Sequence, residues 1–549
     1  MHSKTGNSLV RVGALLLAGA AMCVSAQSPP LSATPGRSGG EGGASGHVSV
    51  TIRPATREQP MLETIVGQPR AAPTGTDPGS RCLALAWRDF STIKDAPTQL
   101  VSASVVADAQ GVPAICVLNG FIAPQVGFRI WLPLVSWNVK YLQTGCGGRC
   151  GDLLADQCEV QVQRGYACLS HDLGHKGTTY DNLWAIDNVP AEIDFGFRAT
   201  HVASIAGKVL VEKYYGQSPK RSYFIGASTG GRQALIEVQR FPLDFDGVVA
   251  GIAVMTMPGT IRGAVATGAA AIGGQVLFQE GKAVLTADEL RSVNAAALAR
   301  CDGADGLVDK IITDPHRCDF EPRSLQCAQG GRGPCLTPRQ VATLDDIYRV
   351  GFQKGSELAW IGAYVAQDGG AGRYLPRSAN PYSYPYAWVF NDASNPDIRG
   401  FQAAGGKLIQ YQGWSDEVIN PLGAAHYYES VERLVGSRAE TQKFYRLFMI
   451  PGQSHIPGNV GAESIDYLLA LEAWVETGHA PEVLIGHKLK TIQRMLGPIV
   501  LASDLQPDNW LYSRPHYPYP VQARYRGRGD PDVAGNFGPW DPVRQRWIK

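Results

Sequence analysis

Short apolar runs alternate with stretches of helical period through much of the chain. From residue 128 onward, apolar runs occur at residues 141–142, 166–169, 223–225, 248–250, 408–411 and 447–450, and helical periodicity occupies 199–215, 232–240, 422–435 and 462–477. Short apolar runs predict buried strands, and apolar residues recurring every three to four positions predict amphipathic helices. Because strands that alternate with helices form parallel sheets covered on both faces, the pattern predicts an α/β fold.

The alternation is interrupted between residues 255 and 400. Gly, Pro and aromatic residues are frequent in this interval, and four of the cysteines fall within it. An insertion that leaves a strand of an open α/β sheet starts near the carboxyl end of that strand, where such sheets bind their ligands. We therefore expect a lid domain over 255–400, inserted between segments 48–254 and 401–549 of one catalytic domain.

The first 26 residues have the pattern of a signal peptide. A basic start precedes an apolar stretch at 12–23 and a small-residue cleavage site at 24–26. A membrane anchor is the alternative, but the apolar stretch is shorter than the roughly 20 residues that span a bilayer. Residues 27–47 are rich in Pro, Gly and Ser, which predicts a disordered leader. We expect a secreted or periplasmic protein.

Charge and cysteine content narrow the possible partners. The chain has 50 Lys and Arg against 49 Asp and Glu, a formal net charge of +1. This balance offers no attraction to polyanions, so nucleic acid is not an expected partner.

Eleven cysteines, one of them in the predicted signal peptide, leave an even number that predicts disulfides in an oxidising compartment. A zinc site is the alternative, but residues 146–168 lack the C-x2-C pairs and the paired histidines of zinc modules.

Ser228 lies at the centre of a G-x-S-x-G motif at 226–230. The motif directly follows the apolar run at 223–225 and directly precedes the helical period at 232–240. Strand, sharp turn and helix in this order form the nucleophile elbow of α/β hydrolases, in which small residues let the strand and the helix pass closely. A glycine-rich turn without a chemical role is the alternative, and the flanking strand and helix favour the elbow.

Two residues that follow later strands complete a possible catalytic triad. A serine hydroxyl needs a general base, and in α/β hydrolases the acid and then the histidine follow the serine in the chain. Asp416 follows the run at 408–411 and His455 follows the run at 447–450. Three other histidines lie inside a helical pattern, at a helix end and in a Pro/Tyr-rich tail: His426, His479 and His516. The order predicts Ser228 as nucleophile, His455 as base and Asp416 as its orienting acid, with a structural role for His455 as the alternative.

The tetrahedral intermediate of such a reaction needs two N–H donors. One normally belongs to the residue after the nucleophile, which is Thr229, and the other to the loop after an early strand. The glycine-rich loop at 145–148 offers that second donor from Cys146 or Gly147. A flexible turn is the alternative reading of this loop.

These motifs together resemble the tannase/feruloyl esterase family of α/β hydrolases, which includes mono(hydroxyethyl) terephthalate hydrolases. The resemblance spans roughly residues 82–526 and rests on segments 137–138, 145–148, 223–232, 240–247, 405–416 and 446–455. It implies an α/β-hydrolase domain, a lid that supplies much of the acyl-group pocket, and carboxylic ester hydrolysis.

Residues 301–311, CDGADGLVDKI, resemble the structural calcium loop in the lid of that family. The resemblance implies Ca²⁺ as a structural cofactor, held by three carboxylates and two main-chain carbonyls: Asp302, Asp305, Asp309, Leu307 and Ile311. Hard oxygen ligands at close spacing suit calcium. A solvated acidic turn is the alternative.

The resemblance also implies three disulfides: Cys82–Cys116, Cys301–Cys318 and Cys327–Cys335. The cysteines at 146, 150, 158 and 168 allow three further pairings, which the sequence leaves open. One departure concerns the catalytic loops. Family members usually carry cysteines directly before the nucleophile and directly after the histidine, where this chain has Ala227 and Ile456. That cross-link cannot form, and we expect an apolar contact between these two side chains in its place.

The sequence thus predicts a secreted serine carboxylic-ester hydrolase acting on small esters of aromatic acids of the feruloyl or galloyl kind. A terephthalate monoester hydrolase is the alternative within the class, but the Arg and aromatic set that it needs for a free carboxylate cannot be placed in this lid. A noncatalytic secreted binding protein on the same fold is a further alternative, and the filled triad positions argue against it. The sequence does not indicate an oligomeric state.

Overall fold

The computed structural model describes most of the chain from residue 75 onward. The described residues are 75–108, 114–177, 183–255, 278–279, 282–328, 335–349, 354, 387–416, 419–455, 457–492 and 506–548. The predicted signal peptide at 1–26 and the predicted leader at 27–47 lie outside them. Ala71–Lys549 forms one compact unit.

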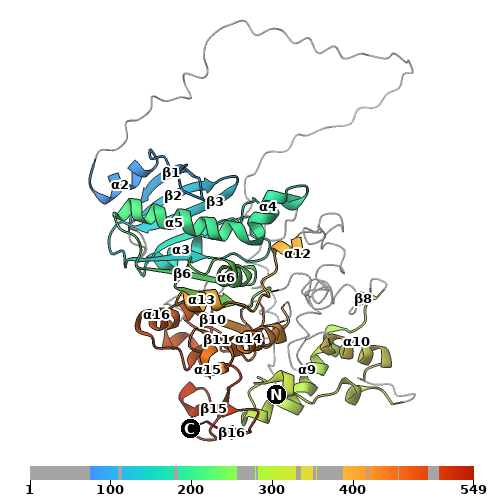
Figure 1. Cartoon of the computed structure of the whole chain (residues 1–549). Helices are drawn as coiled ribbons and strands as arrows, with labels where there is room; N and C mark the ends of the chain where they lie inside the picture. The colour runs from blue at the N-terminus through green and yellow to red at the C-terminus, as the bar shows by residue number, and fades with distance from the viewer. Residues whose placement is uncertain are drawn as a thin grey trace, which may run out of the picture. The chain divides into compact units, whose positions relative to one another are not determined.

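A nine-stranded sheet forms the core of the unit (Figure 1). In spatial order its strands are β1 (Thr98–Val106), β2 (Ile115–Ile122), β3 (Val126–Pro133), β5 (Ala167–His171), β4 (Lys140–Thr144), β6 (Arg221–Ala227), β7 (Gly247–Gly251), β10 (Lys407–Gly413) and β11 (Tyr445–Ile450). From β5 to β11 all neighbouring strands pair in parallel. The six apolar runs of the sequence coincide with these parallel strands, and the predicted α/β fold is confirmed.

The expectation of a parallel sheet is wrong at one edge. There β1, β2 and β3 join the sheet by antiparallel pairing, and β3 also runs antiparallel to β5. β2 ends at Ile122 and β3 begins at Val126, which leaves no room for the helical crossover that a parallel neighbour requires. The sheet is therefore mixed, and its parallel part carries the elements of the predicted site.

Helices cover both faces of the sheet. The longer ones are α5 (Ala199–Tyr215), α6 (Thr229–Arg240), α14 (Pro421–Val435) and α16 (Tyr467–Thr477), and the shorter ones are α2 (Pro78–Leu85), α3 (Ala155–Val162), α4 (Val189–Ile193), α13 (Arg399–Ala403) and α15 (Arg438–Thr441). Phe224 lies in the hydrophobic core that includes α5 and α6, whereas Tyr223 and Ile225 lie in the core that includes α3 and α16. This two-sided burial explains why the strands appear as continuous apolar runs.

The chain between β7 and β10 contains a separate hydrophobic core. The elements described in this part of the chain include β8 (Phe278–Gln279), β9 (Lys282–Ala283), α9 (Ala287–Cys301), α10 (Pro338–Arg349) and α12 (Ala387–Phe390). A capping box formed by Thr286 and Glu289 begins α9. A core of its own is a property of inserted domains. The extent of the lid, 255–400, stays a prediction.

Small antiparallel sheets follow α16. β12 (Leu484–Leu489) pairs with β13 (Trp510–His516), and β15 (Phe537–Asp541) pairs with β14 (Gln522–Tyr525) and β16 (Arg546–Trp547). Arg514 of β13 donates to Asp309 Oδ2 at 2.7 Å. The C-terminal sheets therefore contact the acidic loop at 301–311.

Five disulfides link cysteines that are close in sequence. The three pairs implied by the family resemblance are present, and the four remaining cysteines pair as Cys146–Cys150 and Cys158–Cys168. These bonds engage all ten cysteines that follow the predicted signal peptide, so the zinc alternative has no thiolate left to use.

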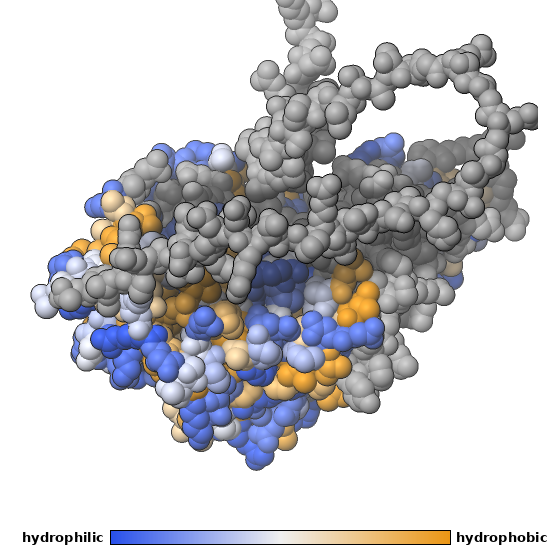
Figure 2. Space-filling model, turned by 90° about the horizontal axis from the view of Figure 1, so that it is seen from above, coloured by the Kyte–Doolittle hydropathy of each residue, from blue (hydrophilic) through white to orange (hydrophobic). Residues whose placement is uncertain are grey.

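The described surface is polar with scattered apolar residues. Hydrophilic and hydrophobic residues are interspersed over the coloured part of the face shown in Figure 2. Leu243, Val308 and Val543 are examples of strongly exposed apolar side chains in different parts of the chain. Among the helices of the described residues, none is long and apolar enough to cross a membrane.

Arg232, in the first turn of α6, is completely buried. Its guanidinium donates to the carbonyls of Phe195 at 2.9 Å and Gly196 at 2.8 Å, and to Asn391 Oδ1 at 2.7 Å. Burial lowers the pKa of Arg232 to about 9, so the group stays charged at neutral pH. One side chain thus ties the helix after the elbow to the segment before α5 and to the chain after α12.

Replacing this side chain should destabilise the fold. Arg232→Met should lower the free energy of unfolding by at least about 3 kcal/mol, because three buried acceptors lose their donor. Arg240→Met is the matched control, since Arg240 ends the same helix and donates to carbonyls near the surface; its loss should stay below about 1 kcal/mol. Urea denaturation followed by circular dichroism measures both, and equal losses would contradict the assigned role of Arg232.

Candidate active site

Ser228 alone forms the turn between β6 and α6. β6 ends at Ala227 and α6 begins at Thr229. Ser228 has φ 58° and ψ −117°, a strained backbone for a residue other than glycine. Its N–H donates to the carbonyl of Gly251 at 3.0 Å, which holds the turn against β7. This strand–turn–helix geometry is that of a nucleophile elbow.

Close backbone contacts explain the glycines around Ser228. A Cβ on Gly226 would lie 2.6 Å from the carbonyl carbon of Gly230, and a Cβ on Gly231 would lie 2.3 Å from the carbonyl oxygen of Gly251. Real Cβ atoms do not approach other atoms so closely, so the strand, the helix and β7 can meet here only without side chains. Glycine at 226 and 231 is therefore a packing requirement of the turn, and Gly230 supplies the backbone that Gly226 approaches.

The structure brings Ser228, His455 and Asp416 together. His455 Nε2 lies 3.1 Å from Ser228 Oγ, and His455 Nδ1 lies 3.2 and 3.1 Å from the two carboxylate oxygens of Asp416. Asp416 follows β10 and His455 follows β11, so both loops leave the same edge of the parallel sheet as the elbow. The Asp416 side chain is fully buried, and 15% of the His455 side chain is exposed.

Two further hydrogen bonds orient the Asp416 carboxylate. Gln412 Nε2 donates to Oδ2 at 2.9 Å, and the N–H of Ile419 donates to Oδ1 at 2.7 Å. If His455 donates its Nδ1–H to this carboxylate, its Nε2 is left to accept the proton of Ser228. Gln412 was not predicted from the sequence, and the available signal was polar residues inside a strand that is almost wholly buried.

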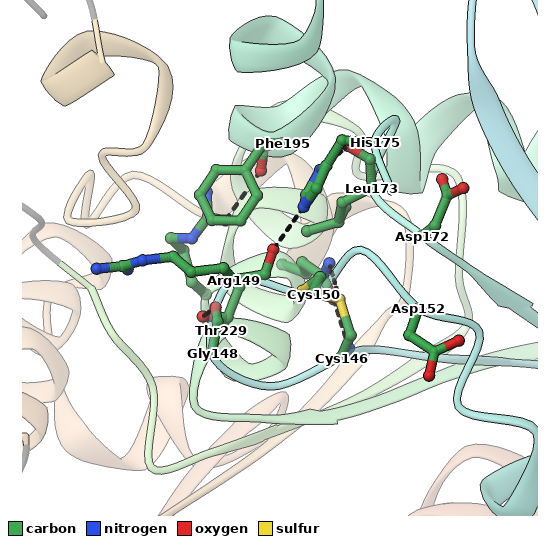
Figure 3. Close-up of a disulfide and its surroundings, with 12 residues drawn as sticks. Cys146, Gly148, Arg149, Cys150, Asp152, Asp172, Leu173, His175, Phe195 and Thr229 are labelled. Atoms are coloured by element: carbon green, nitrogen blue, oxygen red, sulfur yellow. Dashed lines mark hydrogen bonds between the residues drawn. A yellow bond between two sulfur atoms is a disulfide. The ribbon is translucent and has the colours of Figure 1, made fainter. Parts of the chain in front are cut away.

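The glycine-rich loop after β4 lies beside the elbow. The N–H of Gly145 donates to the carbonyl of Ile225 at 2.9 Å and so extends the pairing of β4 with β6. Thr229 Oγ1 donates to the carbonyl of Gly148 at 2.6 Å, a contact drawn in Figure 3. The predicted second donor loop therefore contacts the residue that directly follows Ser228.

The two candidate donors of this loop differ in their surroundings. The N–H of Cys146 donates to Gln233 Oε1 at 3.3 Å and is engaged inside the protein. A side chain added at Gly147 would meet nothing within 4 Å, so Gly147 borders open space. The geometry favours Gly147 over Cys146 as a group that could reach a substrate.

The other histidines lie in different settings. His426 is exposed on α14, and His479 is exposed after α16. His516 is buried in β13, its Nε2 lies 2.9 Å from the carbonyl of Ala462, and burial lowers its pKa to about 4. His516 is thus a neutral structural histidine over most of the physiological pH range.

The contact expected between Ala227 and Ile456 stays a prediction. Ala227 packs against the hydrophobic core on the α16 side of the sheet. Ile456 lies outside the described residues.

The acidic loop at 301–311 contains the oxygen donors that suit a hard cation. Asp302 is buried and accepts from the N–H groups of Asp309 and Lys310, and Asp305 accepts from the N–H of Leu307. Burial raises the pKa of Asp305 to about 6, with smaller contributions in the same direction from Asp309 and Asp302. Asp309 and Asp302 thus repel the Asp305 carboxylate, although oxygens of the three side chains do not all lie within 4.8 Å of one another, and a divalent cation would reduce that repulsion.

A second cluster of possible metal ligands lies between α5 and α6. Within the described parts of the chain, His201, Glu237 and Asp244 are the set of three ligating side chains whose atoms lie within 4.8 Å of one another. His201 Nδ1 lies 2.6 Å from Asp244 Oδ2, and Lys208 donates to the main-chain carbonyl of Asp244. Because the Lys208 ammonium already provides positive charge, we interpret this cluster as an internal ion network.

Most of the chain is similar in sequence to known esterases. The family model described as "Tannase and feruloyl esterase" matches residues 112–368 and 382–539. An uncharacterized esterase of Xanthomonas campestris pv. campestris is 31% identical over 85% of this chain and 91% of its own. The mono(2-hydroxyethyl) terephthalate hydrolase of Piscinibacter sakaiensis is 27% identical over 82% of this chain and 89% of its own.

A solved structure gives the same fold. The crystal structure of feruloyl esterase B from Aspergillus oryzae superposes with a TM-score of 0.69 at 24% identity, over 84% of this chain and 100% of that one. Fold, strand–turn–helix geometry and sequence matches agree. The chain belongs to the tannase and feruloyl esterase family of α/β hydrolases and is a carboxylic ester hydrolase.

Proposed function

We propose that the protein is a secreted serine esterase that cleaves esters of aromatic acids through Ser228, His455 and Asp416. The observation that carries the proposal is the contact of 3.1 Å between His455 Nε2 and Ser228 Oγ, with Asp416 on the other ring nitrogen. These distances suit proton transfer between the groups. The strained turn at Ser228 supports the same assignment because it presents the hydroxyl clear of the backbone.

In the first half of the reaction, His455 removes the Ser228 proton as Oγ attacks the ester carbonyl carbon. The resulting oxyanion receives hydrogen bonds from the N–H groups of Thr229 and Gly147. His455 then gives its proton to the leaving alcohol, and an acyl-enzyme remains on Ser228. Asp416 keeps the imidazole oriented and stabilises its positive charge during both proton transfers.

In the second half, a water molecule replaces the alcohol. His455 removes a proton from this water as it attacks the acyl carbon, and the same two N–H groups stabilise the second oxyanion. Collapse of that intermediate releases the carboxylic acid and returns the proton to Ser228. The residues that serve acylation therefore also serve deacylation.

Two kinds of acyl group are candidates for the substrate. The matching family model is named for tannase and feruloyl esterase, which supports galloyl and feruloyl esters. The relative named as a mono(2-hydroxyethyl) terephthalate hydrolase supports a terephthalate monoester as the second candidate. Comparing kcat/KM for methyl ferulate, methyl gallate, mono(2-hydroxyethyl) terephthalate and p-nitrophenyl acetate separates them, and we expect the first two esters to be preferred.

Secretion is supported by two independent features. The first 26 residues have the pattern of a signal peptide. The described chain contains five disulfides, which form and persist in oxidising compartments. Together they favour a periplasmic or extracellular destination.

Ser228→Ala should abolish ester hydrolysis and leave the fold intact. Loss of the nucleophile removes the acyl-enzyme route, so kcat on the best ester of the panel should fall by several orders of magnitude. Ser222→Ala, at the start of the same strand, is the control, because Ser222 uses its backbone N–H to bind Asp246. Turnover by Ser228→Ala within about tenfold of wild type would reject the assignment of Ser228 as nucleophile.

We also propose that the loop at 301–311 binds a structural Ca²⁺. Its ligands would be the carboxylates of Asp302, Asp305 and Asp309 with the main-chain carbonyls of Leu307 and Ile311. A bound Ca²⁺ would offset two of the three negative charges, and Arg514 pairs with the carboxylate of Asp309. The ion pair between Asp309 and Arg514 also connects this loop to the C-terminal sheets.

Removal of calcium should lower stability. A chelator should reduce the free energy of unfolding by about 2–3 kcal/mol, the gain expected from a ligand present at about 100 times its Kd. Asp305→Asn should abolish the difference between calcium-loaded and chelated samples. Asp319→Asn is the control because this exposed carboxylate pairs with Arg300 at the surface. Thermal denaturation with and without chelator measures this difference. An unchanged melting midpoint of the wild type would reject the calcium site.

A further inference from the structure

The Cys146–Cys150 disulfide closes the loop that lies against the elbow (Figure 3). The contact between loop and elbow is very close, because a Cβ on Gly145 would lie 2.7 Å from Gly230 Cα. Gln233, on α6, accepts from the N–H of Cys146 and lies with its Nε2 3.4 Å from Cys146 Sγ. The first half of the loop is thus fixed to the helix that begins at the elbow.

The second half of the loop is fixed to a different part of the chain. His175 Nε2 lies 2.8 Å from the carbonyl of Arg149, and the His175 ring stacks on Trp184 at 3.9 Å. The N–H of Gly151 donates to the carbonyl of Asp172 at 3.2 Å. The residues between these two anchored halves are Gly147 and Gly148; the carbonyl of Gly148 accepts from Thr229 Oγ1, but glycine has the least restricted backbone of any residue.

The disulfide supplies a further restraint. Cys150 has φ 60°, a left-handed conformation that is unfavourable for a residue other than glycine, and its N–H donates to the carbonyl of Gly147 at 3.0 Å. Both half-cystines are 4% exposed. The bond spans four positions, whereas the other disulfides span 8 to 34. A bond across so short an interval restrains little of the unfolded chain, so its main effect is on local geometry.

The restrained turn contains one of the two donors that the proposed reaction needs. Among the hydrogen bonds between described residues, the N–H groups of Cys146 and Cys150 have partners inside the protein, and those of Gly147 and Thr229 take part in none. Thr229 and the loop are joined directly by the bond from Thr229 Oγ1 to Gly148. The two available N–H groups therefore belong to neighbouring segments that are locked together.

We infer that the Cys146–Cys150 disulfide is a positioning element of the oxyanion hole, which holds the N–H of Gly147 in place beside that of Thr229. The inference rests on the proposed serine-esterase function. Oxyanion donors act only when they are fixed before the charge develops, because reorganising them during the reaction cancels their benefit. The bond should therefore contribute to kcat and little to substrate binding or to global stability.

The experiment compares variants of the full-length protein with the best ester of the substrate panel. Cys146→Ala/Cys150→Ala should lower kcat about tenfold or more, since complete loss of one oxyanion donor costs about a hundredfold to a thousandfold. KM should change less than about threefold, and the melting midpoint should stay close to that of the wild type. Cys327→Ala/Cys335→Ala is the control because it removes another short-range disulfide, which is partly exposed and lies in the chain between β7 and β10, and its kcat should equal that of the wild type.

A further variant separates the cross-link from backbone strain. Cys146→Ala/Cys150→Gly also removes the bond, but glycine adopts φ 60° without strain. We expect it to be impaired like the alanine pair, because the loop is equally open. Wild-type kcat in either variant, or a loss seen only in the melting midpoint, would overturn the inference. Failure of the proposed function is distinguishable, since it would appear as activity in Ser228→Ala.

Discussion

The left-handed backbone of Ser228 is the constraint on which the site depends. A residue with a side chain adopts this conformation at a cost of about 1–3 kcal/mol, so the surrounding structure must enforce it. β7 does so from one side by accepting the N–H of Ser228 at Gly251, and Val254 donates back to the carbonyl of Ser228. The same turn sets where α6 begins. The positions of the Thr229 N–H, of Gln233 and of Arg232 are thus consequences of one strained residue.

Buried amide side chains hold the loops around this turn. Gln412 orients Asp416, and Gln233 engages the N–H of Cys146. Both glutamines are almost completely buried, where hydrogen bonds are strong and an unpaired group is costly. No disulfide can join the serine and histidine loops at Ala227 and Ile456, so hydrogen bonds and the paired strands align these loops. The Cys146–Cys150 disulfide lies in the loop after β4.

The parts of the molecule that could be predicted from sequence are those with a local signature. The elbow needs glycines at fixed offsets, and Asp416 and His455 each lie in the loop after an apolar run, so one stretch of chain identifies each of them. The antiparallel edge was missed because β2 and β3 are joined by a short turn and show no alternation with helices. Gln412 and Gln233 were missed because their partners are defined only after the chain has folded. The choice of Cys150 as the partner of Cys146 depends on a left-handed turn that the sequence does not reveal.

The short spans of the disulfides have a consequence for how the chain folds. Each of the five bonds joins residues that are neighbours in sequence, the farthest being 34 apart, so each can close before distant segments meet. The sheet itself demands the opposite, since β7 ends at Gly251 and its neighbour β10 begins only at Lys407. Contacts between remote segments are slow to form because a long loop must close first. In an oxidising compartment such bonds can fix local pieces early, whereas the pairing that brings the serine and the histidine onto one sheet receives no covalent help.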